Sequence, residues 1–339
     1  MTRLLAGALA ALLFAGAAAL SAGAGQAQQL KFFRIASGSV GGTYFPTAAL
    51  LAQAISNPPG ALPCERGGAC GAPGMIAIAQ SAQGSLANVV AVEKGQVESG
   101  LVQSDVAYWA WSASGVFADR EPMTNLRAIA SLYPEHLHAV ATRKSGVTGF
   151  TDLKGKRIAL GLPASGALVG ARIVLGAAGL AEDADYEAAF LNSAEAVARL
   201  KDGSADAMLT VTGYPQPAIA DLADATGIAL LPVDGDLREA ILADNLFFSA
   251  AAVPGGTYAG VPDDTPTVAV TALWLTHADQ AEETVYQITR ALWSKTARAL
   301  FIGAHAGAAG IRLETALEGM SVPLHPGAER FYREAGLID

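Results

Sequence analysis

Short apolar runs alternate with runs of helical spacing along most of the chain, and this alternation limits the possible folds more than any other feature. Parallel strands need long crossover connections, which are usually helices, so the pattern predicts an α/β fold with parallel sheets and helices on both faces. The predicted strands are Phe32–Ala36, Met75–Gln80, Ser99–Gln103, Leu126–Leu132, Leu137–Thr142, Arg157–Leu160, Glu187–Leu191, Ala207–Val211, Ile228–Pro232 and Thr267–Leu275.

The helix predictions have local support at their ends. Pro46 falls in the first turn of a helix over Phe45–Ile55, where proline is tolerated. A second helix is predicted over Ala194–Lys201, with Ser193 before it and Gly203 after it. A third is predicted over Thr284–Leu300, where Asp279 and Glu282 resemble a capping box, and a last one over Ala328–Ala335.

Two segments have the features of crossings between lobes. His136–Arg143 runs into Lys144-Ser145-Gly146 and a fresh α/β series, and Pro262–Pro266 is a loop before the long run Thr267–Leu275. We therefore expect a first lobe made of residues 28–142 and 266–339, with a second lobe, residues 143–265, inserted between its halves. The two crossing strands would then form a hinge.

Residues 1–27 have the features of a secretory signal peptide. Arg3 is their one charged side chain, an apolar run spans Leu4 to Leu20, and small residues follow, so cleavage is expected after Ala24 or Ala27. An uncleaved anchor is the alternative. No later stretch reaches about 18 uncharged apolar residues, so we expect a periplasmic chain that does not span the membrane after cleavage.

Cys64 and Cys70 are the two cysteines, six positions apart in a Gly-rich stretch. An even count, short spacing and export favour a disulfide, and two free thiols are the alternative. Metal binding is disfavoured because no His or second Cys pair lies nearby. The formal charge of −9 at pH 7 argues against nucleic acid as a partner, since that needs a basic patch.

Four turns rich in Gly, Ser and Thr follow predicted strands, where open α/β sheets bind ligands. Unpaired N–H groups at such turns and at helix N-termini suit a carboxylate or phosphate. Each turn can also be an ordinary turn, and each tyrosine a packing residue. The four turns are Ser39–Tyr44, Gly84–Asn88, Pro163–Gly166 and Gly213–Pro215.

Other polar side chains are candidates for the same site. Gln103 ends a strand and can offer an amide, although it can equally be an ordinary strand-end residue. Arg127, Arg143 and Arg172 can each clamp a carboxylate with two hydrogen bonds, and their spacing does not choose among them.

Enzyme and cofactor motifs are absent from the sequence. It has no G-x-S-x-G and no G-x-G-x-x-G opening a helix, and Gly149 to Lys156 is one residue too long for a P-loop, with Arg157 where Ser or Thr is required. His136 and His138 are the one histidine pair at metal-ligand spacing, and a metal there is the alternative. We therefore expect no enzyme activity, no cofactor and no metal.

Several motifs resemble the TAXI family, the solute-binding subunits of tripartite ATP-independent periplasmic (TRAP) transporters. The matching segments occur in order over essentially the whole chain after residue 27: Ser37–Pro46, Gly84–Asn88, Leu101–Tyr108, Leu126–Pro134, Asp152–Arg157, Gly213–Ile219, Pro254–Gly260 and Leu324–Tyr332. The resemblance implies a type II periplasmic binding fold, with two doubly wound α/β lobes joined by a two-strand hinge. It also implies a small ligand, such as glutamate, glutamine or a related carboxylate, that is delivered to the membrane subunits of a cation-coupled TRAP permease.

Taken with the four turns, the resemblance places the ligand between the lobes. Ala167 departs from the Gly-Ser-Gly-Thr of many relatives and removes a hydroxyl donor, so the ligand itself is not carried over. We expect capture of a small carboxylate by hinge closure; a sensor that presents its ligand state to a membrane kinase is the alternative. The expected binding residues are Ser39, Gly42, Thr43, Tyr44, Ser85, Asn88, Gln103, Ser165, Gly166, Gly213 and Tyr214.

Overall fold

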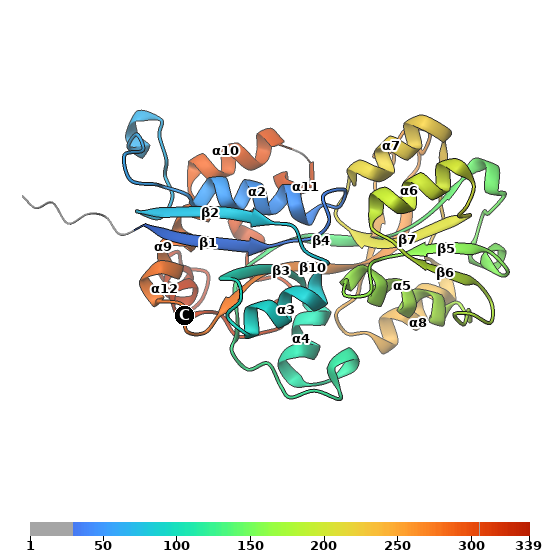
Figure 1. The fold of residues 1–339 in the computed structure, drawn as a ribbon, viewed down its shortest axis with the longest axis horizontal. Helices are drawn as coiled ribbons and strands as arrows, with labels where there is room; N and C mark the ends of the chain where they lie inside the picture. Colours follow the sequence, from blue (N-terminus) through green and yellow to red (C-terminus); the bar gives the residue numbers. More distant parts are fainter. Residues whose placement is uncertain (1–29, 305) are drawn as a thin grey trace, which may run out of the picture.

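The computed structural model describes residues 30–304 and 306–339. The predicted signal peptide, residues 1–27, lies outside the described residues. Within the described ranges no helix is long and apolar enough to cross a membrane. The chain forms two α/β lobes side by side, with two long strands running through both of them (Figure 1).

The elements follow the alternation seen in the sequence. The strands are β1 (Lys31–Ala36), β2 (Met75–Gln80), β3 (Ser99–Gln103), β4 (Leu126–Thr142), β5 (Arg157–Leu160), β6 (Glu187–Phe190), β7 (Ala207–Thr212), β8 (Ile228–Leu230), β9 (Ser249–Val253) and β10 (Thr265–His277). The helices are α2 (Tyr44–Ile55), α3 (Ser85–Glu93), α4 (Ser104–Ser112), α5 (Gly166–Ala177), α6 (Ser193–Asp202), α7 (Pro217–Thr226), α8 (Gly235–Asp244), α9 (Glu282–Leu292), α10 (Lys295–Ala304), α11 (Ala306–Ala309) and α12 (Pro326–Glu334).

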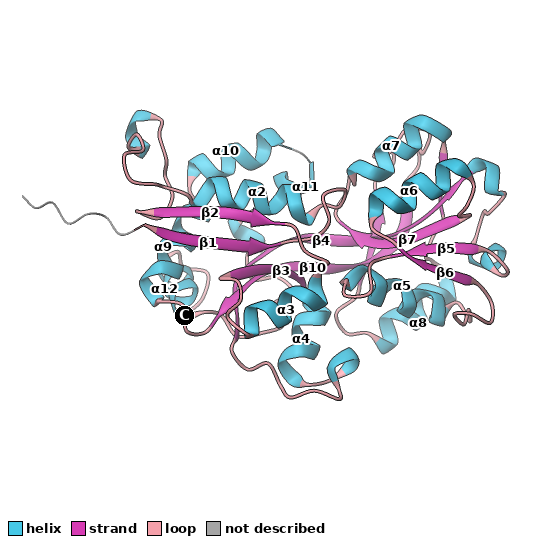
Figure 2. Ribbon diagram, viewed as in Figure 1, coloured by secondary structure: helices cyan, strands magenta, loops and turns pink. Residues whose placement is uncertain are grey.

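One twisted sheet joins the two lobes, in the order β2-β1-β3-β10-β4-β7-β5-β6. We call the part around β1, β2 and β3 the first lobe, and the part around β5, β6 and β7 the second lobe. Helices cover both faces of the sheet in each lobe (Figure 2). In the second lobe, α6 and α7 lie on one face and α5 and α8 on the other. The expected fold class, two α/β lobes joined by a two-strand hinge, is confirmed.

The crossing strands differ from the parallel pairing expected. β1 pairs with β2 and β3 in parallel, and β5 pairs with β6 and β7 in parallel, but β10 is antiparallel to β3, β4 and β9, and β4 is antiparallel to β7. The sheet is therefore mixed. A chain that leaves a lobe on one strand and returns on another must reverse its direction, so the two crossing strands pair antiparallel.

Two strand predictions were wrong. Leu126–Leu132 and Leu137–Thr142 are parts of one strand, β4. Strand β10 pairs with β4 on both sides of Pro134, and the pairing shifts its register beside Leu273. The strand β9, Ser249–Val253, was missed because its Ala-rich sequence has little β propensity. It forms because residues Thr265–Ala269 of β10 pair with it in antiparallel orientation.

Four features of the predicted helices also differ. Asn192, not Ser193, caps α6, and its side chain accepts from the N–H of Glu195 while that glutamate reaches back. The single helix expected over 284–300 is two helices, which separate at Trp293 and Ser294. Asp279 is not a cap, because α9 begins after Ala281. The last helix starts two residues early, at Pro326, with His325 as its cap.

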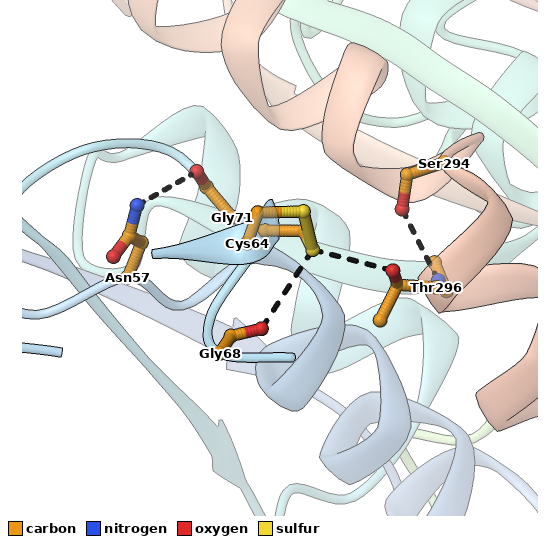
Figure 3. Close-up of a disulfide and its surroundings, with 8 residues drawn as sticks. Asn57, Cys64, Gly68, Gly71, Ser294 and Thr296 are labelled. Carbon is orange, nitrogen blue, oxygen red and sulfur yellow. Dashed lines mark hydrogen bonds between the residues drawn. A yellow bond between two sulfur atoms is a disulfide. The ribbon is translucent and has the colours of Figure 1, made fainter. Parts of the chain in front are cut away.

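The disulfide between Cys64 and Cys70 is confirmed, with the sulfurs 1.98 Å apart. It closes a short loop that reaches back toward α10, where the Cys70 sulfur lies 3.2 Å from the Thr296 hydroxyl (Figure 3). Asn57 donates a long hydrogen bond, 3.4 Å, to the Gly71 carbonyl at the base of this loop. The closed loop is short, so we expect it to stabilise the fold by less than the ~3 kcal/mol of a 15-residue loop.

Candidate ligand-binding site

Six helices of the described chain begin at one small cavity between the lobes. The cavity measures about 80 Å³, which is far below the roughly 300–1,000 Å³ of pockets for drug-sized ligands and fits only a small molecule. Three helices of the first lobe line the cavity with a residue at their start: Tyr44 of α2, Ser85 of α3 and Gln103 before α4. Three helices of the second lobe do the same: Gly166 of α5, Ser193 of α6 and Gln216 before α7. The full lining is Gly38, Ser39, Gly42, Thr43, Tyr44, Gln83, Gly84, Ser85, Gln103, Glu135, Ser165, Gly166, Ala167, Ser193, Thr210, Val211, Thr212 and Gln216.

The electrostatics of this cavity come from the backbone. Side chains cap α5 through Ser165 and α6 through Asn192, whereas α2, α3, α4 and α7 have no side-chain cap among the described residues. Each uncapped helix start presents N–H groups and about half a positive charge. None of the described lining residues is Arg, Lys or His. The helix ends therefore supply the attraction for an anion.

Most of the expected binding residues meet at this cavity. Ser39, Gly42, Thr43, Tyr44, Ser85, Gln103, Ser165 and Gly166 line it, although they come from four separate turns. Gly213 and Tyr214 line a neighbouring cavity of about 390 Å³, with Pro134 and Thr271 of the crossing strands among its other walls. Gly213 still touches the smaller cavity's wall, because its N–H donates to Thr43 Oγ1 at 3.2 Å.

Asn88 lies beneath the cavity instead of lining it. Its side-chain amide donates to the carbonyls of Ser37 (2.8 Å) and Leu101 (2.7 Å), and the residue is buried. These bonds fix the end of β1 to β3, directly before the turn that forms one wall. The structure therefore gives Asn88 a role in positioning that turn.

Replacing Asn88 by Ala is expected to lower the free energy of unfolding by about 2 kcal/mol, because two buried carbonyls lose their donor. Urea unfolding followed by circular dichroism measures this loss. Asn125→Ala is the matched control: its amide bonds Glu93 at the surface, and its removal should cost less than about 0.5 kcal/mol. Equal losses for the two variants would contradict the positioning role.

Contacts across the cavity hold the two lobes together. The hydroxyls of Thr43 and Thr212 are 2.9 Å apart, and the N–H of Ala87 donates to the Ala164 carbonyl at 3.2 Å. Elsewhere between the lobes, the ring centroids of Tyr108 and Phe247 lie 4.9 Å apart. Each pair joins a first-lobe residue to a second-lobe residue. The two lobes are thus in direct contact beside the cavity.

Two glycines permit this close approach. Gly84 has a φ of +120°, a conformation that favours glycine, and a Cβ there would lie 3.1 Å from the Cα of Ser165 in the other lobe. A Cβ on Gly166 would collide with the Gln103 amide and come within 2.8 Å of Ser85 Oγ. Side chains at either position would therefore push the lobes apart.

Glu135 is the acidic residue of the cavity, and the sequence reasoning missed it. It lies in β4, is 2% exposed, and accepts a 2.7 Å hydrogen bond from the Tyr44 hydroxyl. Burial raises the pKa of its carboxyl to about 8, opposed by the Tyr44 bond and reinforced by the nearby Asp105. A carboxylate in the middle of an apolar strand was the signal that could have identified it.

Other lining residues missed in the sequence belong to segments that were recognised for a different reason. Thr210 and Val211 end a predicted strand, Thr212 follows it, and Ser193 was placed directly before a predicted helix. Gln216 precedes α7, and its buried Oε1 has no hydrogen-bond partner in the described chain. Their common feature is a position where a strand ends or a helix begins.

The candidate arginines and histidines do not line this cavity. Arg172 pairs with Glu182, Arg143 donates to the Gly260 carbonyl, and Arg127 donates to nearby backbone carbonyls. The Nδ1 atom of His138 lies 3.0 Å from the His136 carbonyl oxygen, and its Nε2 atom lies 3.0 Å from the Tyr258 hydroxyl. No group of three or more potential metal ligands occurs in the described ranges.

Comparison with solved structures supports the fold. The chain is similar to MatC from Rhodopseudomonas palustris with bound malate, at 12% identity and a TM-score of 0.53, over 92% of this chain and 98% of that one. It is similar to a periplasmic transporter (12% identity, TM-score 0.52, 90% and 93% covered) and to a protein of Bordetella bronchiseptica RB50 (17% identity, TM-score 0.52, 89% and 85% covered). At these identities the likeness shows the shared two-lobed fold.

A family model gives the broader assignment. The model described as the NMT1-like family matches residues 35–336, which include both lobes, the two crossing strands and every residue that lines the cavity. This match covers far more than half of the chain. The protein therefore belongs to the NMT1-like family.

Proposed function

We propose that this chain is a periplasmic solute-binding protein that captures a small carboxylate, either an acidic amino acid such as glutamate or a dicarboxylate, by closure of its two lobes. The observation that carries the proposal is the convergence of six helix N-termini on one cavity without a basic side chain. Such ends bind carboxylates through backbone N–H groups and the helix dipole. The malate bound to the structurally similar MatC is a ligand of this chemical class.

The proposed mechanism is a shift between open and closed forms. The first lobe is taken as residues 28–142 and 266–339 and the second as 143–265, with the crossing strands β4 and β10 as the hinge. A ligand between the lobes contacts helix starts from both of them, so it binds the closed form more tightly and raises its population. No reaction is assigned to the protein.

The proposed partner is the membrane part of a TRAP permease, as the resemblance to the TAXI family implies. In this role the closed form delivers its ligand to the permease. Proteoliposomes that contain the permease should take up the ligand only when the binding protein is added. Uptake without the binding protein would contradict the assignment.

A thermal-shift screen of the chain without residues 1–27 tests the ligand class. The panel contains L-glutamate, L-aspartate, L-glutamine, glutarate, succinate, malate and, as non-carboxylate anions, alkanesulfonates. A ligand at 100 times its dissociation constant should stabilise the protein by about 2.7 kcal/mol. The proposal expects carboxylates to give the largest shift. A panel in which no carboxylate raises the melting temperature contradicts it.

Replacing Gln103 by Ala is expected to weaken binding of the best panel ligand at least tenfold, or about 1.4 kcal/mol. The residue lines the cavity and is 2% exposed, and its buried Oε1 has no hydrogen-bond partner among the described residues. Isothermal titration calorimetry measures the change. Gln96→Ala removes an exposed amide outside the cavity and should leave the affinity unchanged. An unchanged affinity for the Gln103 variant would remove this residue from the site.

A further inference from the structure

The cavity combines two kinds of unsatisfied group. The uncapped starts of α2, α3, α4 and α7 offer N–H donors, which suit a carboxylate. The side chains present acceptors instead. The Oε1 atoms of Gln103 and Gln216, both buried, have no hydrogen-bond partner in the described part of the chain. A ligand that satisfies this cavity must therefore bring donors as well as a negative charge.

The amide orientations support this assignment of acceptors. Gln216 Nε2 donates to Ser193 Oγ at 3.0 Å, and its buried oxygen has no hydrogen-bond partner in the described chain. The Gln103 side chain interacts with the Glu135 carboxyl, and its oxygen is directed at Gly166 on the opposite lobe. Both amide oxygens and Glu135 are therefore acceptors at the same small cavity.

Glu135 is a further acceptor at this cavity. Its Oε2 accepts from Tyr44, and no Arg, Lys or His among the described lining residues pairs with this acid. A ligand with carboxylates alone would place negative charge beside a buried acid. A ligand that carries an ammonium group beside its carboxylate supplies both the positive charge and three N–H donors.

We propose that Glu135 is the specificity-determining residue of this cavity and selects a small carboxylate that bears an ammonium group over the same carboxylate without one. This inference rests on the proposed function. The carboxylate of the ligand lies at the helix starts, and its ammonium group lies at Glu135 and the two amide oxygens. Glu135 thereby chooses between the two ligand types that the helix ends alone accept equally.

Matched ligand pairs test the role of Glu135. Titration calorimetry compares L-glutamate with glutarate and L-aspartate with succinate, each pair differing only in the ammonium group. The wild type should bind the amino acid at least tenfold more tightly in the pair that fits the cavity. In Glu135→Gln that preference should fall at least tenfold, because the amide keeps the shape and loses the charge. A desamino partner that binds wild type as tightly as its amino acid, or a preference that Glu135→Gln leaves unchanged, overturns the inference.

Asp105→Asn is the control variant. Asp105 is another buried acid near Glu135, but it does not line the cavity, and its Oδ1 accepts from the N–H of Val106. The same loss of a charge there should change the preference less than threefold. Circular dichroism and the melting temperature confirm that both variants fold. No binding by any carboxylate of the screen contradicts the proposed function and, with it, this inference.

A measurement on the wild type keeps the test independent of any variant. The titratable groups around Glu135 are Tyr44 from α2, Asp105 from α4 and Tyr133 from its own strand, and burial raises the pKa of all of them. With its pKa near 8, Glu135 holds a proton at pH 7 that an ammonium group displaces. Calorimetry in buffers of different ionisation enthalpy should show about one proton released with the amino acid and none with its desamino partner. Equal proton release for both ligands overturns the inference.

Discussion

Replacing Gly166 by Val should weaken ligand binding at least 100-fold, about 2.7 kcal/mol, while leaving each lobe folded. Gly166 is the first residue of α5, and a side chain there points at Gln103 and Ser85 of the first lobe. Within the second lobe the exchange costs little, since valine is a better helix former than glycine. The penalty therefore falls on the closed form alone, and the ligand must overcome it in order to bind.

Calorimetry with the best ligand of the screen measures the loss, and small-angle scattering measures the closure directly. Wild type should contract when the ligand is added, whereas Gly166→Val should keep the larger radius of gyration. Gly176→Val is the matched control on the same helix, because a side chain there meets open space. Tight binding by Gly166→Val would show that the lobes do not need to approach as closely as this structure has them.

Replacing Trp274 by Ala should lower the free energy of unfolding by about 3–5 kcal/mol, the range for large core side chains. Trp274 is fully buried in β10, where it pairs with Leu101 of β3 and Ala130 of β4. Its ring meets Phe33 of β1 edge to face, with centroids 6.3 Å apart. It therefore joins the crossing strands to the first-lobe core, and its removal leaves a cavity at their centre.

Denaturant unfolding at 25 °C measures this loss, with Trp274→Phe as the control. Phenylalanine keeps an aromatic ring beside Phe33 and removes an indole N–H that has no hydrogen-bond partner among the described residues. We expect a cost below about 1.5 kcal/mol for that variant. If Trp274→Ala and Trp274→Phe lower the free energy of unfolding equally, the packing of the tryptophan ring does not stabilise the fold.

Much of the fold was predictable because its signals are local. Apolar runs bounded by turn residues place strands such as Met75–Gln80 and Ser99–Gln103 at their observed bounds. The predictions failed where a partner strand decides the outcome. Pro134 indicated a break in β4, yet pairing with β10 continues this strand past the proline. The Ala-rich run of β9 indicated no strand, yet pairing with β10 makes it one.

The candidate site divides in the same way. Turns at strand ends identified Thr43, Ser85 and Ser165, because the carboxyl ends of neighbouring strands meet at one edge of a sheet. The sequence context of Asn88 does not reveal that its amide bonds the carbonyls of Ser37 and Leu101. The same reasoning missed Glu135, whose partner Tyr44 is 91 positions away.

The sequence by itself determined the alternation of strands and helices, the two-lobed class and the turns that line the cavity. Each of these follows from the spacing of apolar, glycine and hydroxyl residues within one element. The tertiary structure alone decided that six helix starts converge, that Gly166 meets Gln103, and that a buried acid lies at the cavity. These features depend on how the crossing strands β4 and β10 set the two lobes against each other, and the local spacing of residues carries no record of that placement.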